Sequence, residues 1–129
     1  MKALLLLLAL APCAAQAGPW SKLAGDKESV LLLDQSSIRK DEHGRKAWTM
    51  QSYRKPHTTP DGKPYLSVRS QHLYACGDAT RTPLAQLFYA DVLGKGEPVA
   101  TFKYEAYDAE QVAPDSYADK ALKAVCKKR

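Results

Sequence analysis

Three histidines, His43, His57 and His72, are the candidate general bases of this sequence, because imidazole exchanges protons near neutral pH. Nucleophilic catalysis needs such a base within reach of a nucleophile, and a zinc or copper site needs several ligands together. These histidines stand fourteen and fifteen positions apart, and two of them fall in turn or loop sequence. His72 falls in a strand pattern, where we expect a half-buried structural role. We therefore predict no catalytic residues, no metal site and no cofactor.

An export signal is predicted at residues 1–17. Lys2 gives a basic start, residues 3–11 form an apolar run, and Ala15-Gln16-Ala17 has the small-x-small pattern that signal peptidase cleaves. The apolar run is too short to cross a bilayer, which takes about 20 residues, so we expect no transmembrane segment. The mature chain is expected to begin at Gly18.

A lipoprotein signal that attaches lipid to Cys13 is the alternative to simple cleavage. Such signals carry a small residue just before the cysteine, whereas Pro12 stands there in this chain. We therefore favour an unanchored periplasmic or secreted product over a lipid-anchored surface form.

Two cysteines, Cys76 and Cys126, remain in the mature chain. In an oxidising compartment they have one possible pairing, so we predict a disulfide between them. A redox or metal pair is the alternative, but the chain has no Cys-x-x-Cys spacing and no clustered histidine. Closing the loop of 50 positions between them would stabilise the fold by about 4 kcal/mol.

The composition indicates one basic domain. Removing 17 of the 129 residues leaves 112, the usual size of a single domain. The chain carries 19 Lys and Arg against 14 Asp and Glu, a formal charge of +5 to which Lys2 contributes one. This charge favours anionic partners, but basic residues are interspersed with acidic ones and no nucleic-acid-binding motif is present, so nucleic acid is not expected.

Period-two patterns separated by turn sequences predict an antiparallel sheet of five to six strands. Residues 18–29 are expected to be a polar lead-in to a domain at residues 30–129. The strands are expected at residues 30–34 with a continuation at 36–39, and at 45–54, 65–76, 84–90 and 99–105.

A loop rather than a strand is expected at residues 55–64, which contain three prolines and an Asp61-Gly62 pair. Tyrosines and cations lie in this segment and beside it, and such residues are enriched at recognition surfaces. A solvated loop without a partner is the alternative interpretation. The candidate binding residues are Tyr53, Arg54, Lys55, His57, Lys63 and Tyr65.

A C-terminal helix is predicted after Ser116, with Asp119 three residues later as in a capping box. Its apolar face comprises Ala118, Leu122 and Cys126, flanked by Ala121 and Val125. The disulfide would therefore fasten this helix across the sheet.

Two assignments concern charged residues outside the candidate binding set. Asp34 is expected to form a structural ion pair with Arg39 or Arg45. The terminal Lys127, Lys128 and Arg129 are interpreted as a solvated tail, with contact to a polyanion as the alternative.

The order and spacing of residues resemble the surface-adhesin protein E-like domain of bacterial exported proteins. The resemblance spans residues 30–126, nearly all of the mature chain. It rests on Leu33, Asp34, Ser37, Ile38, Arg45, Trp48, Tyr53, Tyr65, Ser67, Cys76, Arg81, Leu84, Tyr89, Val112, Pro114, Ser116 and Cys126.

The resemblance implies an antiparallel sheet with a disulfide-tethered C-terminal helix. For the best-known member of the family it also implies a surface lipoprotein that binds host matrix and serum proteins and forms homodimers. This chain departs from the family in lacking the lipid-attachment pattern, and in carrying Tyr107 where the family often has Trp.

The leading functional hypothesis is a non-catalytic exported binding domain that contacts a protein partner, a host matrix or serum protein. The alternative is a periplasmic structural or assembly protein of the cell envelope without adhesin activity, which would pair through a strand edge or apolar patch. A small enzyme is the least favoured class.

Overall fold

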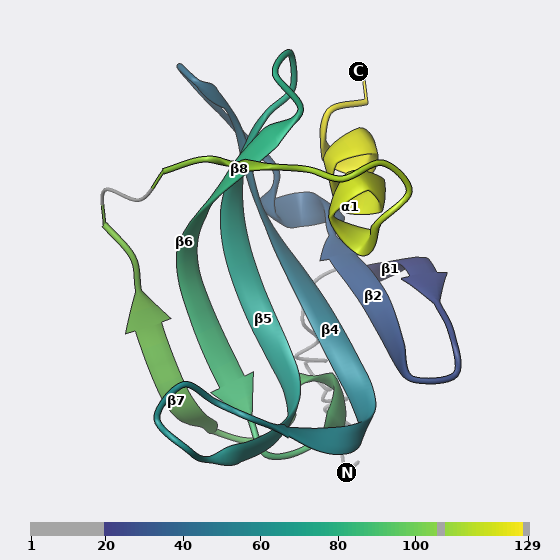
Figure 1. The fold of residues 1–129 in the computed structure, drawn as a ribbon, viewed down its shortest axis with the longest axis vertical. Coiled ribbons are helices and arrows are strands. Elements are labelled where there is room, and N and C mark those ends of the chain that lie inside the picture. The colour runs from purple at the N-terminus through teal and green to yellow at the C-terminus, as the bar shows by residue number, and fades with distance from the viewer. Residues whose placement is uncertain (1–19, 106–107, 128–129) are drawn as a thin grey trace, which may run out of the picture.

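The computed structural model describes residues 20–105 and 108–127, which form an antiparallel sheet covered on one face by a helix. The strand order is β1-β2-β4-β5-β6-β7, with β3 paired to β4 and β8 to β6 (Figure 1). The predicted antiparallel sheet is therefore confirmed, with six main strands. The strands are β1 (Trp20–Gly25), β2 (Ser29–Asp34), β3 (Arg39–Asp41), β4 (Gly44–Thr58), β5 (Pro64–Ala75), β6 (Thr80–Tyr89), β7 (Pro98–Lys103) and β8 (Glu110–Gln111).

The helix α1 (Tyr117–Val125) begins where the capping pattern predicts. The Ser116 hydroxyl accepts a hydrogen bond from the Asp119 N–H at 3.1 Å, and the Asp119 carboxylate accepts one from the Asp115 N–H at 2.9 Å. The first bond satisfies a donor that a helix N-terminus would otherwise leave unpaired, and the second holds the residue before the cap against the first turn. No described helix has the length and apolar character needed to span a membrane.

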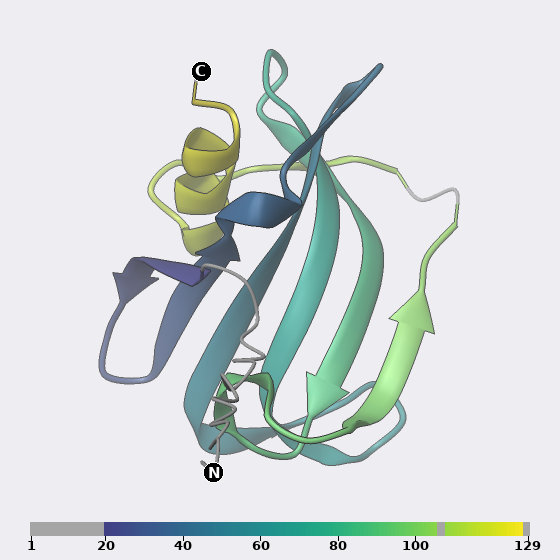
Figure 2. The ribbon, with the colours of Figure 1, turned by 180° about the vertical axis from the view of Figure 1, so that it is seen from behind.

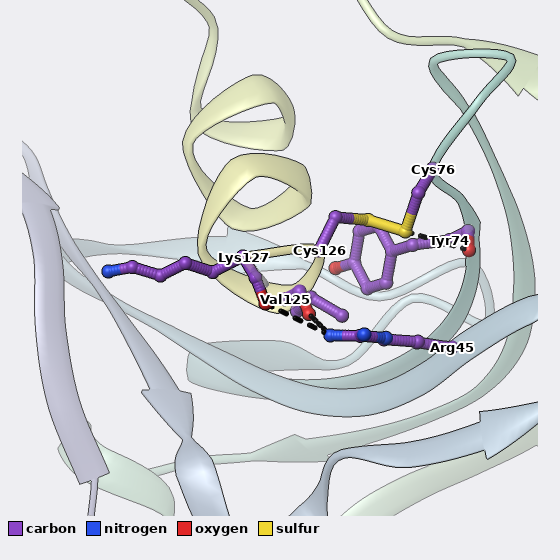
Figure 3. Close-up of a disulfide and its surroundings, with 6 residues drawn as sticks. All are labelled: Arg45, Tyr74, Cys76, Val125, Cys126 and Lys127. Carbon is purple, nitrogen blue, oxygen red and sulfur yellow. Dashed lines mark hydrogen bonds between the residues drawn. A yellow bond between two sulfur atoms is a disulfide. The ribbon is translucent and has the colours of Figure 1, made fainter. Parts of the chain in front are cut away.

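The predicted disulfide joins Cys76, just after β5, to Cys126, just after α1, with a Cα–Cα distance of 5.7 Å (Figure 3). The cysteines therefore fasten the end of the helix to the end of a central strand. The core lies between these elements, and its largest fully buried side chain is that of Tyr74. The core residues are Leu31, Leu33, Ala47, Tyr74, Val112, Ala121, Leu122 and Val125.

The opposite face of the sheet is covered at one end by the connection between β6 and β7, which contains the short 3-10 turn η2 (Val92–Gly94). Figure 2, which views the molecule from behind, shows this connection passing across the strands at that end of the sheet. The Ser52 hydroxyl accepts a hydrogen bond from the Leu93 N–H at 3.0 Å, and the Ser67 hydroxyl accepts one from the Gly94 N–H at 2.8 Å. Ser67 is consequently fully buried although it points away from the helix.

Two segments expected to be loops belong instead to strands. β4 continues to Thr58 and β5 begins at Pro64, so the expected loop at residues 55–64 shrinks to a turn at 59–63. Pro56 is tolerated because it falls where the register between β4 and β5 shifts, and Pro64 because it opens its strand. β6 likewise begins at Thr80, before the start expected at residue 84, and Pro83 lies beside its own register shift.

Two further expectations differ from the structure. The segment expected to be a polar lead-in provides edge strand β1, in which Leu23 and Ala24 pack against the core. Asp34 forms no ion pair with either Arg39 or Arg45. Its carboxylate accepts hydrogen bonds from the Ser36 N–H at 3.0 Å and hydroxyl at 2.6 Å, which caps the 3-10 turn η1 (Gln35–Ser37).

Candidate functional site

Three rings from the predicted binding residues converge at the end of β4 and the start of β5. Their ring centroids lie 3.8 Å apart for Tyr53 and His57, 6.0 Å for Tyr53 and Tyr65, and 5.8 Å for His57 and Tyr65. The register shift after Ser52 brings His57 opposite Tyr65. We call Tyr53, His57 and Tyr65 the aromatic cluster.

The aromatic cluster rests on the apolar side chains of β6 and β7. Tyr65 packs edge-on against Phe88 at 4.7 Å, and Phe88 packs in turn against Phe102 at 5.8 Å. Burial, and then the neighbouring Tyr65 hydroxyl, raise the pKa of Tyr53, and burial raises the pKa of Tyr65. Both phenols are therefore neutral at physiological pH and can donate as well as accept hydrogen bonds.

Cations flank the aromatic cluster. Arg54, Lys55 and His57 line a depression of about 300 Å³ together with Lys27 and Glu28 from the β1–β2 turn. The Arg54 N–H donates to the Glu28 carbonyl at 3.0 Å, which fixes the turn beside β4. Lys27 and Glu28 were missed in the sequence because only the pairing of β2 with β4 brings them here; a register prediction would have found them.

Lys63 does not belong to this depression. Its ammonium donates to the Val99 carbonyl at 3.0 Å and lies 3.4 Å from the Asp61 carboxylate. The first contact braces the β4–β5 turn against β7, and the second lies within the turn. The structure therefore places five of the six candidate residues in the aromatic cluster or the adjoining depression, whereas Lys63 supports the turn.

A cleft of about 460 Å³ runs from the aromatic cluster along the sheet beneath α1. His72 lies in its wall and is only 7% exposed. Burial, with a smaller contribution from Arg81, lowers the pKa of His72 to about 3, so its ring is neutral. The cleft is lined by Leu31, Thr49, Gln51, Tyr53, Tyr65, Val68, Ser70, His72, Arg81, Pro83, Gln86, Tyr104, Glu110, Tyr117, Ala118 and Ala121.

The three histidines occupy three separate places: His43 in the turn between β3 and β4, His57 on β4 and His72 on β5. Across residues 20–105 and 108–127, no three His, Cys, Asp or Glu side chains are grouped so as to hold a metal ion. The predicted export signal with Cys13, and also Tyr107, Lys128 and Arg129, lie outside the described residues.

Comparison with known protein families identifies one that matches this chain. A family model described as surface-adhesin protein E matches residues 20–127. No curated protein sequence gives a match.

Solved structures with the same fold are those of protein E from Haemophilus influenzae. One superimposes with a TM-score of 0.60 at 19% identity, covering 91% of this chain and 90% of that chain. A second crystal form gives 0.61 at 19% identity, with coverage of 93% and 96%. Protein E from non-typeable H. influenzae gives 0.53 at 19% identity, with coverage of 92% and 82%. At this identity the likeness concerns the fold alone.

Proposed function

This chain belongs to the surface-adhesin protein E family, and from that membership we propose that it is a non-catalytic, exported bacterial protein that binds a host matrix or serum protein. The proposed contact surface is the aromatic cluster with the adjacent cations Arg54 and Lys55. Packing of three rings from two strands is the observation that carries this proposal.

The aromatic cluster has the properties of a recognition surface. Tyrosine supplies contact area with few rotatable bonds, and its hydroxyl adds a hydrogen bond. The packing of Tyr65 on Phe88 holds one ring in place before any partner arrives. Less conformational entropy is then lost on binding than with a mobile loop.

The adjacent depression indicates the charge of the partner. Lys27, Arg54 and Lys55 face a single carboxylate, that of Glu28. An excess of cations around aromatic rings favours an acidic protein surface and speeds its association. The partner is therefore proposed to present carboxylates beside apolar or aromatic side chains.

The double variant Arg54→Glu/Lys55→Glu tests the surface. Binding of the mature protein to a panel of immobilised matrix and serum proteins would be measured by surface plasmon resonance, at two salt concentrations. We expect at least a tenfold loss of affinity, and a smaller salt dependence. Lys63 is left intact because its contacts brace the turn.

The matched control is Lys95→Glu/Lys103→Glu, which makes the same change of net charge at exposed positions elsewhere. Equal loss in both double variants would show a non-specific charge effect and contradict the proposed surface. A wild-type protein that binds no member of the panel, but retains envelope proteins from a bacterial extract, would favour the envelope-assembly alternative.

A further inference from the structure

A second surface lies at the opposite end of β4, where the β3–β4 hairpin brings like charges together. Lys40 stands directly opposite Arg45, and Arg39 directly opposite Lys46. Like charges in directly opposed positions destabilise an antiparallel pair. Within the described residues only Lys46 of these four has a carboxylate partner, Asp41 at 3.7 Å. The hairpin therefore keeps a repulsion that an anion would relieve.

A groove of about 730 Å³ lies beside this hairpin, between it and the end of α1. Among residues 20–105 and 108–127, three cations line it and no carboxylate does, and most of the remaining wall is apolar. We call it the basic groove. Its lining residues are Leu23, Gln35, Ile38, Lys40, Arg45, Ala124, Val125 and Lys127.

Arg45 is held in position within the basic groove. Its Nη1 donates to the Val125 carbonyl at 2.9 Å and to the Lys127 carbonyl at 3.2 Å (Figure 3). The disulfide through Cys126 fixes the same end of the helix. The guanidinium makes no ion pair with any described residue. Hydrogen bonds therefore fix its position, but no described carboxylate neutralises its charge.

The lining restricts the class of ligand. A wholly apolar ligand would remove the three cations from water without a counter-charge, which is costly. A small inorganic anion would leave the apolar wall formed by Leu23, Ile38 and Ala124 uncovered. A bilayer surface would call for a flat face, whereas these residues line a groove.

We propose that the basic groove binds a single long-chain carboxylate, a fatty-acid-like amphiphile. The carboxylate lies among Lys40, Arg45 and Lys127, where guanidinium can form paired hydrogen bonds with it. The hydrocarbon chain covers the half-buried side chains of Leu23 and Ile38.

Dodecanoate below its critical micelle concentration is the probe, with binding to the mature protein measured by calorimetry and by methyl NMR shifts of Leu23 and Ile38. Two comparison ligands separate the parts of the amphiphile: acetate has the head without the chain, and decyl maltoside has a chain with an uncharged head. We expect saturable one-to-one binding of dodecanoate, and affinity at least tenfold lower for both comparison ligands.

Two variants locate the bound dodecanoate. Lys40→Glu/Lys127→Glu should weaken binding at least tenfold, and Ala124→Phe should weaken it by filling the groove without changing the charge. The control Lys95→Glu/Lys103→Glu should bind dodecanoate within twofold of wild type. Circular dichroism would verify that each variant is folded.

Several results would overturn the inference: equal affinity for decyl maltoside, an unchanged affinity in both groove variants, or retention only on phosphatidylglycerol vesicles. The same variants test the dodecanoate site independently of the proposed host-protein surface, so either proposal can fail while the other holds. Arg54→Glu/Lys55→Glu should keep dodecanoate binding, and Lys40→Glu/Lys127→Glu should keep binding to the protein panel.

Discussion

At the scale of single residues, His72 shows how burial decides the role of a reactive side chain. It projects from β5 between Ala47 of β4 and Pro83 of β6, its neighbours in the sheet. Its Nδ1 is buried without a hydrogen-bond partner among the described residues. A histidine whose pKa is lowered to about 3 does not take up a second proton at neutral pH, and its ring packs in the neutral form.

The first prediction is a pH dependence of stability that originates at His72. Below pH about 6.5 the unfolded chain binds a proton at this ring and the folded chain does not, so stability falls as pH drops from about 6.5 towards 3. At about 1.4 kcal/mol per unit, this group should lower the free energy of unfolding by about 2 kcal/mol between pH 7.5 and 5.0. Urea unfolding at the two pH values measures the difference.

His72→Gln removes this titration and should shrink the pH 7.5 to 5.0 difference by about the same 2 kcal/mol, whatever its effect at pH 7.5. His43→Gln, in the exposed hairpin turn, is the matched control and should leave the difference as in wild type. An identical pH dependence in wild type and His72→Gln would show that the ring is not held neutral.

The second prediction concerns Gly44, which ends the turn between β3 and β4. A Cβ at this position would overlap the Tyr74 carbonyl oxygen and lie 3.2 Å from the Cα of Ala75, and neither is a flexible side-chain atom. We expect Gly44→Ala to cost about 2–4 kcal/mol of unfolding free energy, since the β4–β5 pairing must open to admit a methyl group. Gly77→Ala has free space around its Cβ and should change stability by less than about 1 kcal/mol. Equal stability of the two variants, measured by thermal unfolding, would contradict this account.

At the scale of elements, the helix depends on its attachments. α1 has nine residues, fewer than an isolated helix needs to be stable in water. Its apolar face packs on the core through Ala121, Leu122 and Val125, and Cys126 ties it covalently to the end of β5. The Arg45 guanidinium adds a third attachment by binding the last carbonyls of the helix.

The third prediction separates the helix from the sheet. Replacing both cysteines, Cys76→Ser/Cys126→Ser, removes a closure across 50 residues and should lower the free energy of unfolding by about 4 kcal/mol. Amide hydrogen exchange should increase more in α1 than in β4 and β5, because the helix is bound to the rest by few other contacts. Reduction of wild type by a thiol should reproduce the loss. Uniform acceleration across sheet and helix would contradict an attachment specific to α1.

The elements were predictable from sequence where one local pattern dominates. Alternation of apolar and polar residues located β5, and the spacing of Ser116 and Asp119 located the start of α1. β1 was missed because its six residues show no clear alternation of apolar and polar side chains, and its pairing with β2 is not a local pattern. The end of β4 was missed because Pro56 argues against a strand unless the register shift beside it is known.

The candidate site was predictable to the same degree. Tyr53 and Tyr65 flank one turn, so any hairpin at that turn brings them together. The bracing role of Lys63 depends on a carbonyl of β7, 36 residues away, and no local pattern records that contact. The basic groove depends on three elements, the β3–β4 hairpin, β1 and the end of α1, and was not visible in the sequence.

At the scale of the whole molecule, one long strand separates two surfaces of different chemistry. β4 carries Arg45 of the basic groove near its beginning and Tyr53 and His57 of the aromatic cluster near its end. Arg45 pairs with Tyr74 and His57 with Tyr65, nine positions apart on β5, so at about 3.3 Å per residue the two residues lie roughly 30 Å apart along the sheet. A partner at one end therefore leaves the other end accessible, and a single molecule can hold both.

The fourth prediction concerns the form in which the molecule leaves the cell. If signal peptidase cleaves after Ala17, intact mass spectrometry of the exported protein should give a chain that begins at Gly18 and carries no lipid. Ala17→Leu should block this cleavage, because the peptidase requires a small side chain there, and the precursor should accumulate in the membrane fraction. Cys13→Ser should leave processing unchanged. A diacylated N-terminal Cys13, lost in Cys13→Ser, would contradict the prediction and place the domain on a lipid anchor, with the aromatic cluster presented at a membrane surface.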